Sequence, residues 1–305
     1  MKKTIYKMMM LVSALCLILQ SCTEWTEPET VDLNYIYPWE REPQTWEDYF
    51  QRLRDYKGRP HYLSFAEFDN APQKVVSEQD FMRCLPDSLD YVSLTNAACL
   101  SEDDRSDLEL MHRKGTRVLY EIDLAAVSME NPEASQFSQW LEGAKAMVDQ
   151  EGLDGWTLKT RIPAGDAEAV SRYEETVKAL SSIEGKVLVY MGSYHHIEEE
   201  DSEKFDLIIL NTQDSEYEAD IKFSILMALE RGIPKEKLLI AGAMGTKVVD
   251  SQLQERESLD VMSDLVFTQG PIAGLAVSNI KADYFHVGDN YMKTEGLIQK
   301  LNPSK

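Results

Sequence analysis

The sequence predicts a closed barrel of eight parallel strands with a helix between most of them, and three observations point to it. After Gly58, short runs rich in β-branched and aromatic residues alternate with amphipathic stretches. There are eight such runs, most of them separated by a stretch long enough for a helix. Residues 58–305 also supply the roughly 250 residues that one such barrel uses. We therefore expect a single (β/α)8 domain, the TIM barrel fold.

The expected strands are bounded by turn residues. They span residues 61–69, 89–94, 116–123, 153–161, 186–193, 205–212, 237–244 and 274–280. The helical patterns between them include residues 102–114, 134–150, 166–181 and 218–231. Gly185 and Gly232 follow the last two patterns at an offset typical of a helix C-terminus.

Alternation along two strands predicts which acids face the barrel interior. In the third expected strand, Glu121 and Asp123 share the face opposite the apolar residues that should contact helices. In the first expected strand, Glu67 and Asp69 share a face in the same way. All four lie toward the carboxyl ends of their strands, where barrel enzymes place their chemistry. A solvated carboxylate beside a loop is the alternative for each of them.

Residues 1–21 have the features of a secretion signal. Lysines and no acid accompany an apolar run over 8–19, which is too short to span a membrane. The run leads into Leu-Gln-Ser-Cys, which resembles a bacterial lipobox. We therefore expect cleavage before Cys22 and a lipid anchor on this cysteine, with an ordinary secretory signal and a chance cysteine as the alternative.

Residues 22–57 are expected to form a linker followed by one helix. The linker is rich in Pro, Glu and Thr without a sustained period, as in a spacer that holds a domain away from a membrane. Residues 46–56 have apolar side chains at helical spacing. The acids that follow Cys22 are similar to an export tag of surface lipoproteins, so we expect an outer-membrane lipoprotein exposed at the cell surface.

The charge of the chain excludes some partners. There are 31 basic and 53 acidic residues, for a formal net charge of −22, and the acidic surplus is spread along the chain. Nucleic acid binding needs clustered Lys and Arg, so no nucleic acid partner is expected. A neutral or cationic partner fits this balance better.

No metal or cofactor is expected. Beyond Cys22, only Cys84 and Cys99 remain, which are too few for a disulfide framework and lack metal-binding spacing, so both are expected to be core thiols. The pair His195-His196 invites a metal interpretation, but its only acidic support nearby is the run over 198–201. We therefore expect no metal site there.

Several segments resemble one enzyme family. LPDSLDYVSL at 85–94, KGTRVL at 114–119 and LDG at 153–155 are similar to glycoside hydrolase family 18 proteins of glycan-foraging Gram-negative bacteria. That family includes endo-β-N-acetylglucosaminidases that cut the core of N-linked glycans. The resemblance continues through FDLII, GLAV, DY and the closing LNP, so it covers residues 58–305.

The catalytic signature of this family is altered here. The family carries Asp-Gly-x-Asp-x-Asp-x-Glu on its fourth strand, and alignment on Asp154 and Gly155 places Thr157, Lys159 and Arg161 where it has Asp, Asp and Glu. In the family the Glu protonates the leaving oxygen, and the Asp before it orients the N-acetyl group that attacks the anomeric carbon. Arginine stays protonated and cannot serve as that acid. The surviving Asp154 fits a structural role.

Two further family positions differ. Asn211-Thr212-Gln213 stands where these hydrolases commonly carry Gln-x-Tyr on the sixth strand. Ser278 stands where the eighth strand carries an aromatic residue under the reacting sugar. Together with the lost carboxylates, these differences predict a relative without catalytic residues.

Alternation also predicts that Lys159 and Arg161 point into the barrel, where buried cations need partners. One hypothesis is that Glu67, Glu121 and Asp123 supply them, giving a charge-paired plug. The alternative is that the cations hold an anionic sugar such as sialic acid or a uronate. Trp156 alternates to the helix-facing side, so we expect it in the core.

The candidate glycan-binding residues follow the fifth, sixth and eighth strands. They are Tyr194, His195, Asn211, Gln213 and Tyr284. Aromatic faces suit the weakly positive C–H groups of sugars, although each ring alone is more often structural.

These residues and the resemblance together predict a non-catalytic surface lipoprotein that binds N-acetylglucosamine-containing or N-linked glycans. The resemblance implies a role in glycan uptake beside an outer-membrane glycan transporter. Two alternatives remain: an endo-β-N-acetylglucosaminidase-like hydrolase with altered catalytic residues, and a structural partner of such a transporter.

Overall fold

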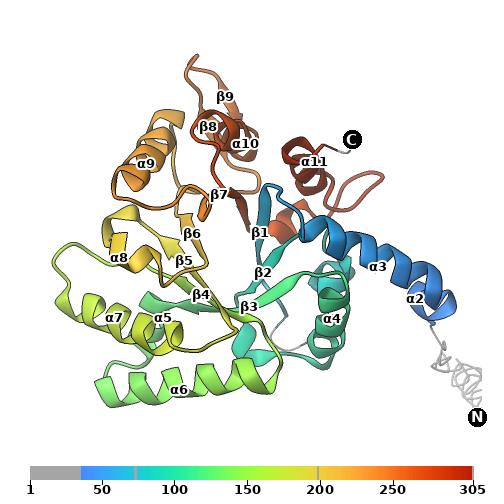
Figure 1. The fold of residues 1–305 in the computed structure, drawn as a ribbon, viewed down its shortest axis with the longest axis horizontal. Coiled ribbons are helices and arrows are strands. Elements are labelled where there is room, and N and C mark those ends of the chain that lie inside the picture. Colours follow the sequence, from blue (N-terminus) through green and yellow to red (C-terminus); the bar gives the residue numbers. More distant parts are fainter. Residues whose placement is uncertain (1–35, 72–73, 198, 304–305) are drawn as a thin grey trace, which may run out of the picture. The chain divides into compact units, whose positions relative to one another are not determined.

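Eight parallel strands close into a barrel in the computed structural model, which describes residues 36–71, 74–197 and 199–303 (Figure 1). The hydrogen-bonded order around the barrel is β1-β10-β7-β6-β5-β4-β3-β2. The strands are β1 (Leu63–Phe68), β2 (Tyr91–Leu94), β3 (Arg117–Asp123), β4 (Gly155–Lys159), β5 (Val187–Gly192), β6 (Leu207–Leu210), β7 (Leu238–Ala243) and β10 (Gly274–Ser278). Each lies within one of the eight predicted runs, so the predicted TIM barrel is confirmed.

Helices surround the strands. They are α3 (Pro43–Lys57), α4 (Glu102–Arg113), α5 (Leu124–Glu130), α6 (Ala134–Gln150), α7 (Ala167–Ser181), α8 (Glu199–Ser202), α9 (Glu218–Glu230), α10 (Ser258–Thr268) and α11 (Met292–Leu301). Short 3-10 turns are η2 (Glu78–Asp80), η3 (Met82–Cys84), η4 (Ala97–Cys99), η5 (Tyr194–His196) and η6 (Ile280–Asp283). No helix in the described ranges is both long enough and apolar enough to cross a membrane.

The chain divides into two compact units, Met1–Trp46 and Glu47–Lys305, and the second contains the barrel. In the first, only residues 36–46 are described. They include the short helix α2 (Pro38–Arg41), beside which the ring of Tyr37 stacks on Trp39 with centroids 4.6 Å apart. The expected lipidation site Cys22 and the expected signal over 1–21 lie outside the described residues.

Side-chain oxygens fix the starts of two barrel helices. At α4, the Ser101 hydroxyl accepts a hydrogen bond from the Asp104 amide at 3.0 Å, and the Asp104 carboxylate accepts one from the Ser101 amide at 2.9 Å. At α7, the Asp166 carboxylate accepts from the Ala169 amide at 3.0 Å. These caps satisfy amides that have no partner within the helix.

The core has an inner and an outer layer, as strand alternation predicts. The inner layer fills the barrel with Phe65, Leu119, Val187, Val189, Met191, Leu207, Ile209, Leu239, Ala241 and Ala276. The outer layer packs the opposite strand faces against the helices, and Trp156 belongs to it. Trp156 is 1% exposed, and its indole N–H donates to the Ala144 carbonyl of α6 at 3.5 Å. Its predicted core position is confirmed.

Two glycines allow strands to pair closely at the amino end of the barrel. A Cβ on Gly155 would lie 1.9 Å from the Val187 carbonyl oxygen. A Cβ on Gly274 would lie 2.0 Å from the Leu63 carbonyl oxygen. Both distances are far shorter than any van der Waals contact, so β4 and β10 must begin with a residue that has no side chain.

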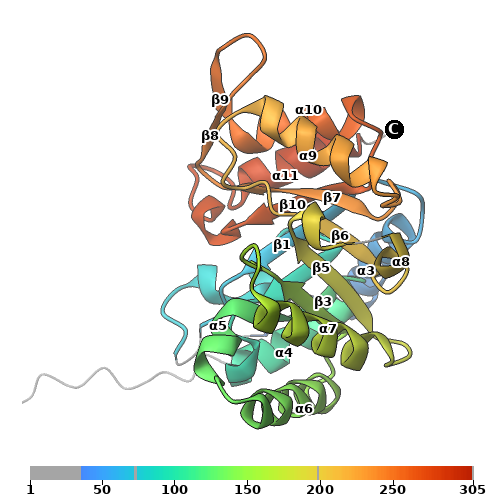
Figure 2. The ribbon, with the colours of Figure 1, turned by 90° about the vertical axis from the view of Figure 1, so that its left-hand side faces the viewer.

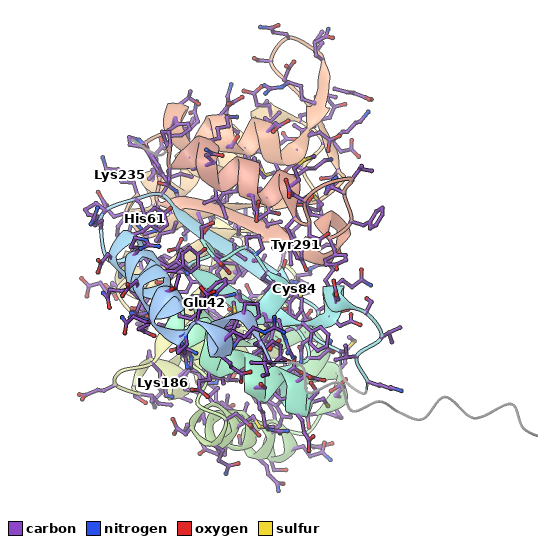
Figure 3. All side chains as sticks on the ribbon, turned by 90° about the vertical axis from the view of Figure 1, so that its right-hand side faces the viewer. Glu42, His61, Cys84, Lys186, Lys235 and Tyr291 are labelled. Atoms are coloured by element: carbon purple, nitrogen blue, oxygen red, sulfur yellow. The ribbon has the colours of Figure 1, made fainter. Side chains whose placement is uncertain are left out.

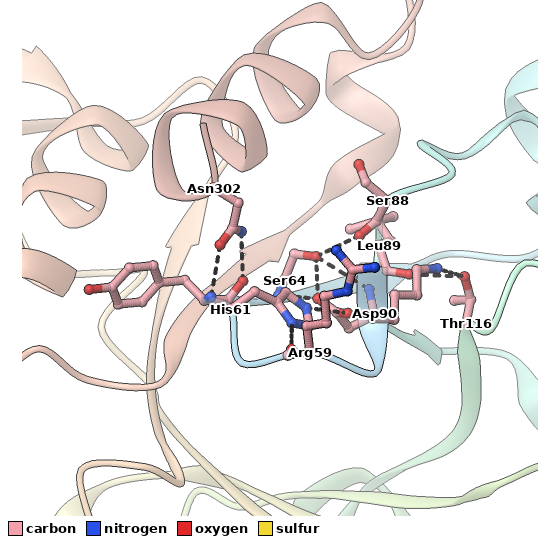
Figure 4. A network of polar contacts seen from close by, with 10 residues as sticks. Arg59, His61, Ser64, Ser88, Leu89, Asp90, Thr116 and Asn302 are labelled. Atoms are coloured by element: carbon pink, nitrogen blue, oxygen red, sulfur yellow. Dashed lines mark hydrogen bonds and ion pairs between the residues drawn. The ribbon is translucent and has the colours of Figure 1, made fainter. Parts of the chain in front are cut away.

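A polar network joins the amino ends of β1 and β2 to the end of the chain (Figure 4). The Asp90 carboxylate accepts from the Ser64 amide at 2.8 Å and contacts His61 Nε2 at 2.9 Å. The side chain of Asn302 bridges both the amide and the carbonyl of Tyr62 at 2.9 Å each. The network therefore closes the bottom of the barrel, opposite the strand ends that carry candidate site residues.

The β8–β9 hairpin was not predicted. It comprises Lys247–Val249 and Glu255–Glu257 and projects from the barrel in the side view (Figure 2). Its strands are only three residues long and rich in charge, so they carry no recognisable alternation.

The prediction that both downstream cysteines are core thiols is wrong for Cys99. Cys84, labelled in Figure 3, is half-buried and packs against the outer core layer. Cys99 is exposed. The turn η4 uses Ala97 to fill the core, which leaves its last residue, Cys99, toward solvent.

Candidate functional site

Polar side chains meet inside the barrel near the carboxyl ends of its strands. We call this group the mouth cluster, and it consists of Glu67, Ser93, Glu121, Lys159 and Ser278. Each residue comes from a different strand and occupies the inward face that alternation predicts. The apolar inner layer lies beneath it, so the cluster forms the polar top of a packed barrel.

Lys159 is the centre of the cluster. Its ammonium forms an ion pair with Glu67 and lies 3.5 Å from Oε1 of Glu121. The side chains of Glu67 and Glu121 are 6% and 5% exposed, whereas that of Lys159 is 17% exposed. The predicted pairing of Lys159 with these two acids is confirmed. The Lys159 side chain is therefore the most exposed of these three.

Each of the two acids also accepts a hydrogen bond from a serine hydroxyl. Ser93 Oγ donates to Oε2 of Glu121 at 3.2 Å. Ser278 Oγ donates to Oε2 of Glu67. Ser278, predicted to stand where the family has an aromatic floor residue, therefore holds a carboxylate in place.

Burial and charge shift the titration of this cluster. Burial raises the pKa of Glu121 to about 7, and the nearby charge of Glu67 adds to the rise, while Lys159 and Ser93 oppose it. For Lys159, burial lowers the pKa, but the charges of Glu121 and Glu67 outweigh it and leave the pKa raised. Two acids thus share one cation, and Glu121 is the group that takes up a proton near neutral pH.

The prediction that Arg161 belongs to a buried plug is wrong. Strand β4 ends at Lys159, so the alternation that would turn Arg161 inward no longer holds two residues later. The Arg161 side chain is 61% exposed, and its guanidinium lies 4.0 Å from the carboxylate of Asp214. Arg161 is therefore a rim residue at the mouth of the barrel.

The predicted partner Asp123 and the predicted inward acid Asp69 lie elsewhere. Asp123 caps α5 by accepting hydrogen bonds from the Ala125 and Ala126 amides at 3.1 Å each. Asp69 follows the end of β1, is exposed, and accepts from Thr95 Oγ1 at 3.1 Å. Both carboxylates are engaged in local hydrogen bonds, and the ion pairs of Lys159 are with Glu67 and Glu121 instead.

Asp154 lies at the opposite end of β4 from the mouth cluster. Its Oδ2 accepts a hydrogen bond from the Val118 amide at 2.7 Å and contacts His112 Nε2 at 2.9 Å. This joins the start of β4 to β3 and α4, which fits the structural role expected for it. Thr157, three residues on, is fully buried, and its hydroxyl has no partner among the described residues.

Asn211 and Gln213 follow the end of β6. The side-chain oxygens Oδ1 of Asn211 and Oε1 of Gln213 are buried and accept no hydrogen bond within the described part of the chain. A buried acceptor without a donor is costly, so both atoms are suited to a hydroxyl or amide group brought by a ligand or water.

The aromatic candidates have different surroundings. Tyr194 is only 9% exposed and packs against His195 with ring centroids 4.0 Å apart, so only His195 of this pair faces solvent. Tyr284 donates to the Glu78 carboxylate at 2.9 Å and packs edge-on against Tyr291. None of the contacts recorded over the described ranges joins Tyr194, His195 or Tyr284 to the mouth cluster.

A pocket beside the mouth was missed by sequence reasoning. It has a volume of about 360 Å³ and lies between α5 and the start of α7, with Arg161 in its wall. It depends on how two helices pack after β3 and β4, for which the sequence alternation carries no signal. In the described ranges, no three His, Cys, Asp or Glu side chains are grouped so that they could hold a metal ion.

Comparisons with known proteins agree with this barrel. The sequence model of the family described as glycoside hydrolase family 18, BT1044-like, matches residues 26–164. A solved selenomethionine form of BT1044 has a TM-score of 0.68 and 18% identity, covering 88% of this chain and 94% of that chain. No curated protein matches the sequence.

Two further solved structures share the fold. The endo-beta-N-acetylglucosaminidase from Cordyceps militaris has a TM-score of 0.62 and 16% identity, covering 83% of this chain and 95% of that chain. A GH18 chitinase from Pseudoalteromonas aurantia has a TM-score of 0.55 and 13% identity, covering 77% and 99% respectively.

The family match over part of the chain and the barrel shared with these solved structures agree with the resemblance to glycoside hydrolase family 18. Within that class, the part of the chain from 26 to 164 matches the BT1044-like group.

Proposed function

We propose that this protein binds glycans without cleaving them. The observation that carries the proposal is the state of the family's catalytic positions on β4. Lys159 stands at the position of the orienting carboxylate and is held by Glu67 and Glu121. Arg161 stands at the position of the acid and has no proton to donate near neutral pH. The two steps of substrate-assisted hydrolysis, orientation of the N-acetyl group and protonation of the leaving oxygen, therefore both lack the carboxyl group that the family uses.

The surroundings of Lys159 support binding. Its side chain is partly exposed, and Asn211 and Gln213 carry acceptors without a partner beyond β6. Sugars present many hydroxyl groups that can both donate and accept. A rigid set of polar groups over a packed barrel can therefore recognise a glycan at small entropic cost.

N-acetylglucosamine-containing or N-linked glycans are the ligand class we propose. A variant of the Cordyceps militaris enzyme has been solved in complex with fucosyl-N-acetylglucosamine-Asn. The shared fold makes the same class of ligand the first to test here, and the polar mouth cluster is compatible with it.

Titration calorimetry tests the proposal directly. Purified protein is titrated with N-glycan fragments and chitooligosaccharides, and each mixture is then analysed for cleavage products. We expect binding without released sugar, and about fivefold weaker binding for Asn211→Ala and Gln213→Ala because each loses a hydrogen bond to the ligand. Gln252→Ala, on the exposed β8–β9 hairpin, is the matched control. Absence of heat with every glycan would refute the proposal.

A second candidate function is an altered hydrolase, and Glu121 is the observation that favours it. With a pKa of about 7, this carboxyl holds a proton that it could donate near neutrality. Its side chain is only 5% exposed and lies behind Lys159, which argues against contact with a substrate. Oligosaccharide released from a glycoprotein by the wild type, and not by Glu121→Gln, would establish the hydrolase and overturn the binding proposal.

We further propose that Cys22 carries a lipid that anchors the protein in the outer membrane, at the cell surface and beside a glycan transporter. Labelling with radioactive palmitate should be lost in Cys22→Ser. Protease added to whole cells should remove the protein if it faces outward. Retention of the label in the variant would contradict the anchor.

A further inference from the structure

The pocket beside the barrel mouth combines an apolar wall with a cation. Helices α5 and α7 lie side by side (Figure 1). Residues of both helices line a pocket of about 360 Å³. We call it the Arg161 pocket. Its apolar lining consists of Leu124, Ala125, Met129, Ile162, Pro163 and Ala169. A volume near the lower end of the usual range for small-molecule sites suits one sugar-sized group.

Arg161 is a cation with unused hydrogen-bonding capacity. The carboxylate that pairs with it belongs to Asp214 and is 4.0 Å away. The side chain of Asp214 is itself 78% exposed. Within the described ranges, the Arg161 guanidinium donates no hydrogen bond that meets normal geometry. Its planar fork of N–H groups can therefore take a carboxylate with two parallel bonds.

The other charged residues of the pocket are already engaged. Arg172 is buried and donates to the carbonyls of Ser128 and Pro132. Glu168 pairs with Arg172, and Asp166 caps α7. Of the charged side chains that line this pocket, Arg161 is the one left for a ligand.

We infer that the Arg161 pocket binds a carboxylate-bearing, N-acylated sugar of the sialic acid type at the end of a glycan. The carboxylate pairs with Arg161, and the acyl methyl group packs against the apolar wall. A uronate has the carboxylate but no acyl group, so it uses only half of these features. The inference rests on the proposed glycan binding and names a subsite of it.

The net charge of −22 does not prevent this contact. Charges farther than about 8 Å are largely screened at physiological ionic strength, whereas a hydrogen-bonded pair at contact is screened much less. The repulsion slows the approach of an anionic glycan more than it weakens the bound state.

Calorimetry with matched glycans tests the inference. A biantennary N-glycan is compared with its desialylated form and with a glucuronic acid-terminated oligosaccharide. The wild type should bind the sialylated form at least tenfold more tightly than the desialylated form. Arg161→Ala should abolish that difference without weakening binding of the desialylated form, and Arg161→Lys should recover part of it.

Two more variants complete the design. Asp214→Asn removes the competing carboxylate and should strengthen binding of the sialylated glycan about twofold to threefold. Lys247→Ala removes one positive charge from the 58%-exposed Lys247 on the hairpin and should leave the preference unchanged.

Each outcome separates the two proposals. Equal affinity for sialylated and desialylated glycans, or equal losses of both in Arg161→Ala, overturns this inference and leaves glycan binding intact. If the glucuronic acid-terminated glycan binds as much more tightly than the desialylated form as the sialylated glycan does, the role of the acyl group is overturned. Absence of binding to every glycan overturns both proposals.

Discussion

Glu121 decides the charge state of the barrel mouth at the scale of single residues. It shares the Lys159 ammonium with Glu67, and its Oε1 is the more distant of the two contacts, at 3.5 Å. Burial is the largest cause of its raised pKa. A proton on Glu121 leaves one cation facing one anion, and loss of that proton leaves a surplus negative charge in a buried place.

Glu121→Gln should therefore flatten the dependence of stability on pH. The folded pKa of about 7 lies above the ordinary value of 4.5, so this group stabilises the fold fully below pH 4.5 and progressively less as pH rises through 7. Urea unfolding at pH 5, 6, 7 and 8 should show that the wild type loses on the order of 1–3 kcal/mol more than the variant across this interval. Glu130→Gln, at an exposed site on α5, is the control. Parallel curves for wild type and Glu121→Gln would contradict the prediction.

Lys159→Met should destabilise the protein because it leaves two carboxylates together without a cation. We expect a loss of about 2–4 kcal/mol in the free energy of unfolding at pH 8 and a smaller loss at pH 5, where an acid takes up a proton. Adding Glu121→Gln should recover part of the loss at pH 8. If the two substitutions were simply additive, the ion-paired arrangement would be wrong.

At the scale of elements, strand ends determine which residues reach the site. Lys159 is the last residue of β4 and points inward, while Arg161 lies beyond the strand and is exposed. The prediction from alternation held for Glu67, Glu121 and Lys159 because regular pairing extends that far. It failed for Arg161 because the sequence carries no signal for the exact end of a strand. The Arg161 pocket escaped prediction for a related reason, since it depends on the packing of α5 against α7.

Gly155→Ala tests the close pairing of β4 with β5. The added methyl group would overlap the Val187 carbonyl, so we expect a loss of more than about 3 kcal/mol in the free energy of unfolding. Gly143→Ala is the matched control, because a Cβ there meets no atom within 4 Å and the residue lies inside α6. That substitution should stabilise the protein by about 0.5–1 kcal/mol in chemical denaturation. Similar values for the two variants would contradict the strand geometry.

At the scale of the whole molecule, the eight strands and their order along the chain could be predicted from the sequence. The runs can be recognised by apolar residues between turn residues, with β-branched and aromatic residues among them, as in VLVYMG of β5. The hairpin β8–β9 and helix α10 could not be predicted in the same way. The hairpin strands are short and charged, and α10 is buried on most of its surface, so it lacks a polar face that would mark a helical period.

The closure of the barrel also depends on the end of the chain. Asn302 forms hydrogen bonds with both backbone groups of Tyr62, at a separation of 240 residues. Asn302→Ala should lower the free energy of unfolding by about 1–2 kcal/mol, measured by urea denaturation. Gln252→Ala, on the projecting hairpin, should leave it unchanged within about 0.5 kcal/mol. An Asn302→Ala protein as stable as the wild type would contradict this contribution.

The arrangement around Lys159 constrains how such a protein could evolve. A carboxylate at position 159 would face Glu67 and Glu121 at short range, so three acids would lie together without a cation between them. A carboxylate at position 159 would therefore require the loss of a second acid from the cluster. The ion pairs thus couple position 159 to positions 67 and 121, so a charge reversal at one of the three positions has to be matched at another.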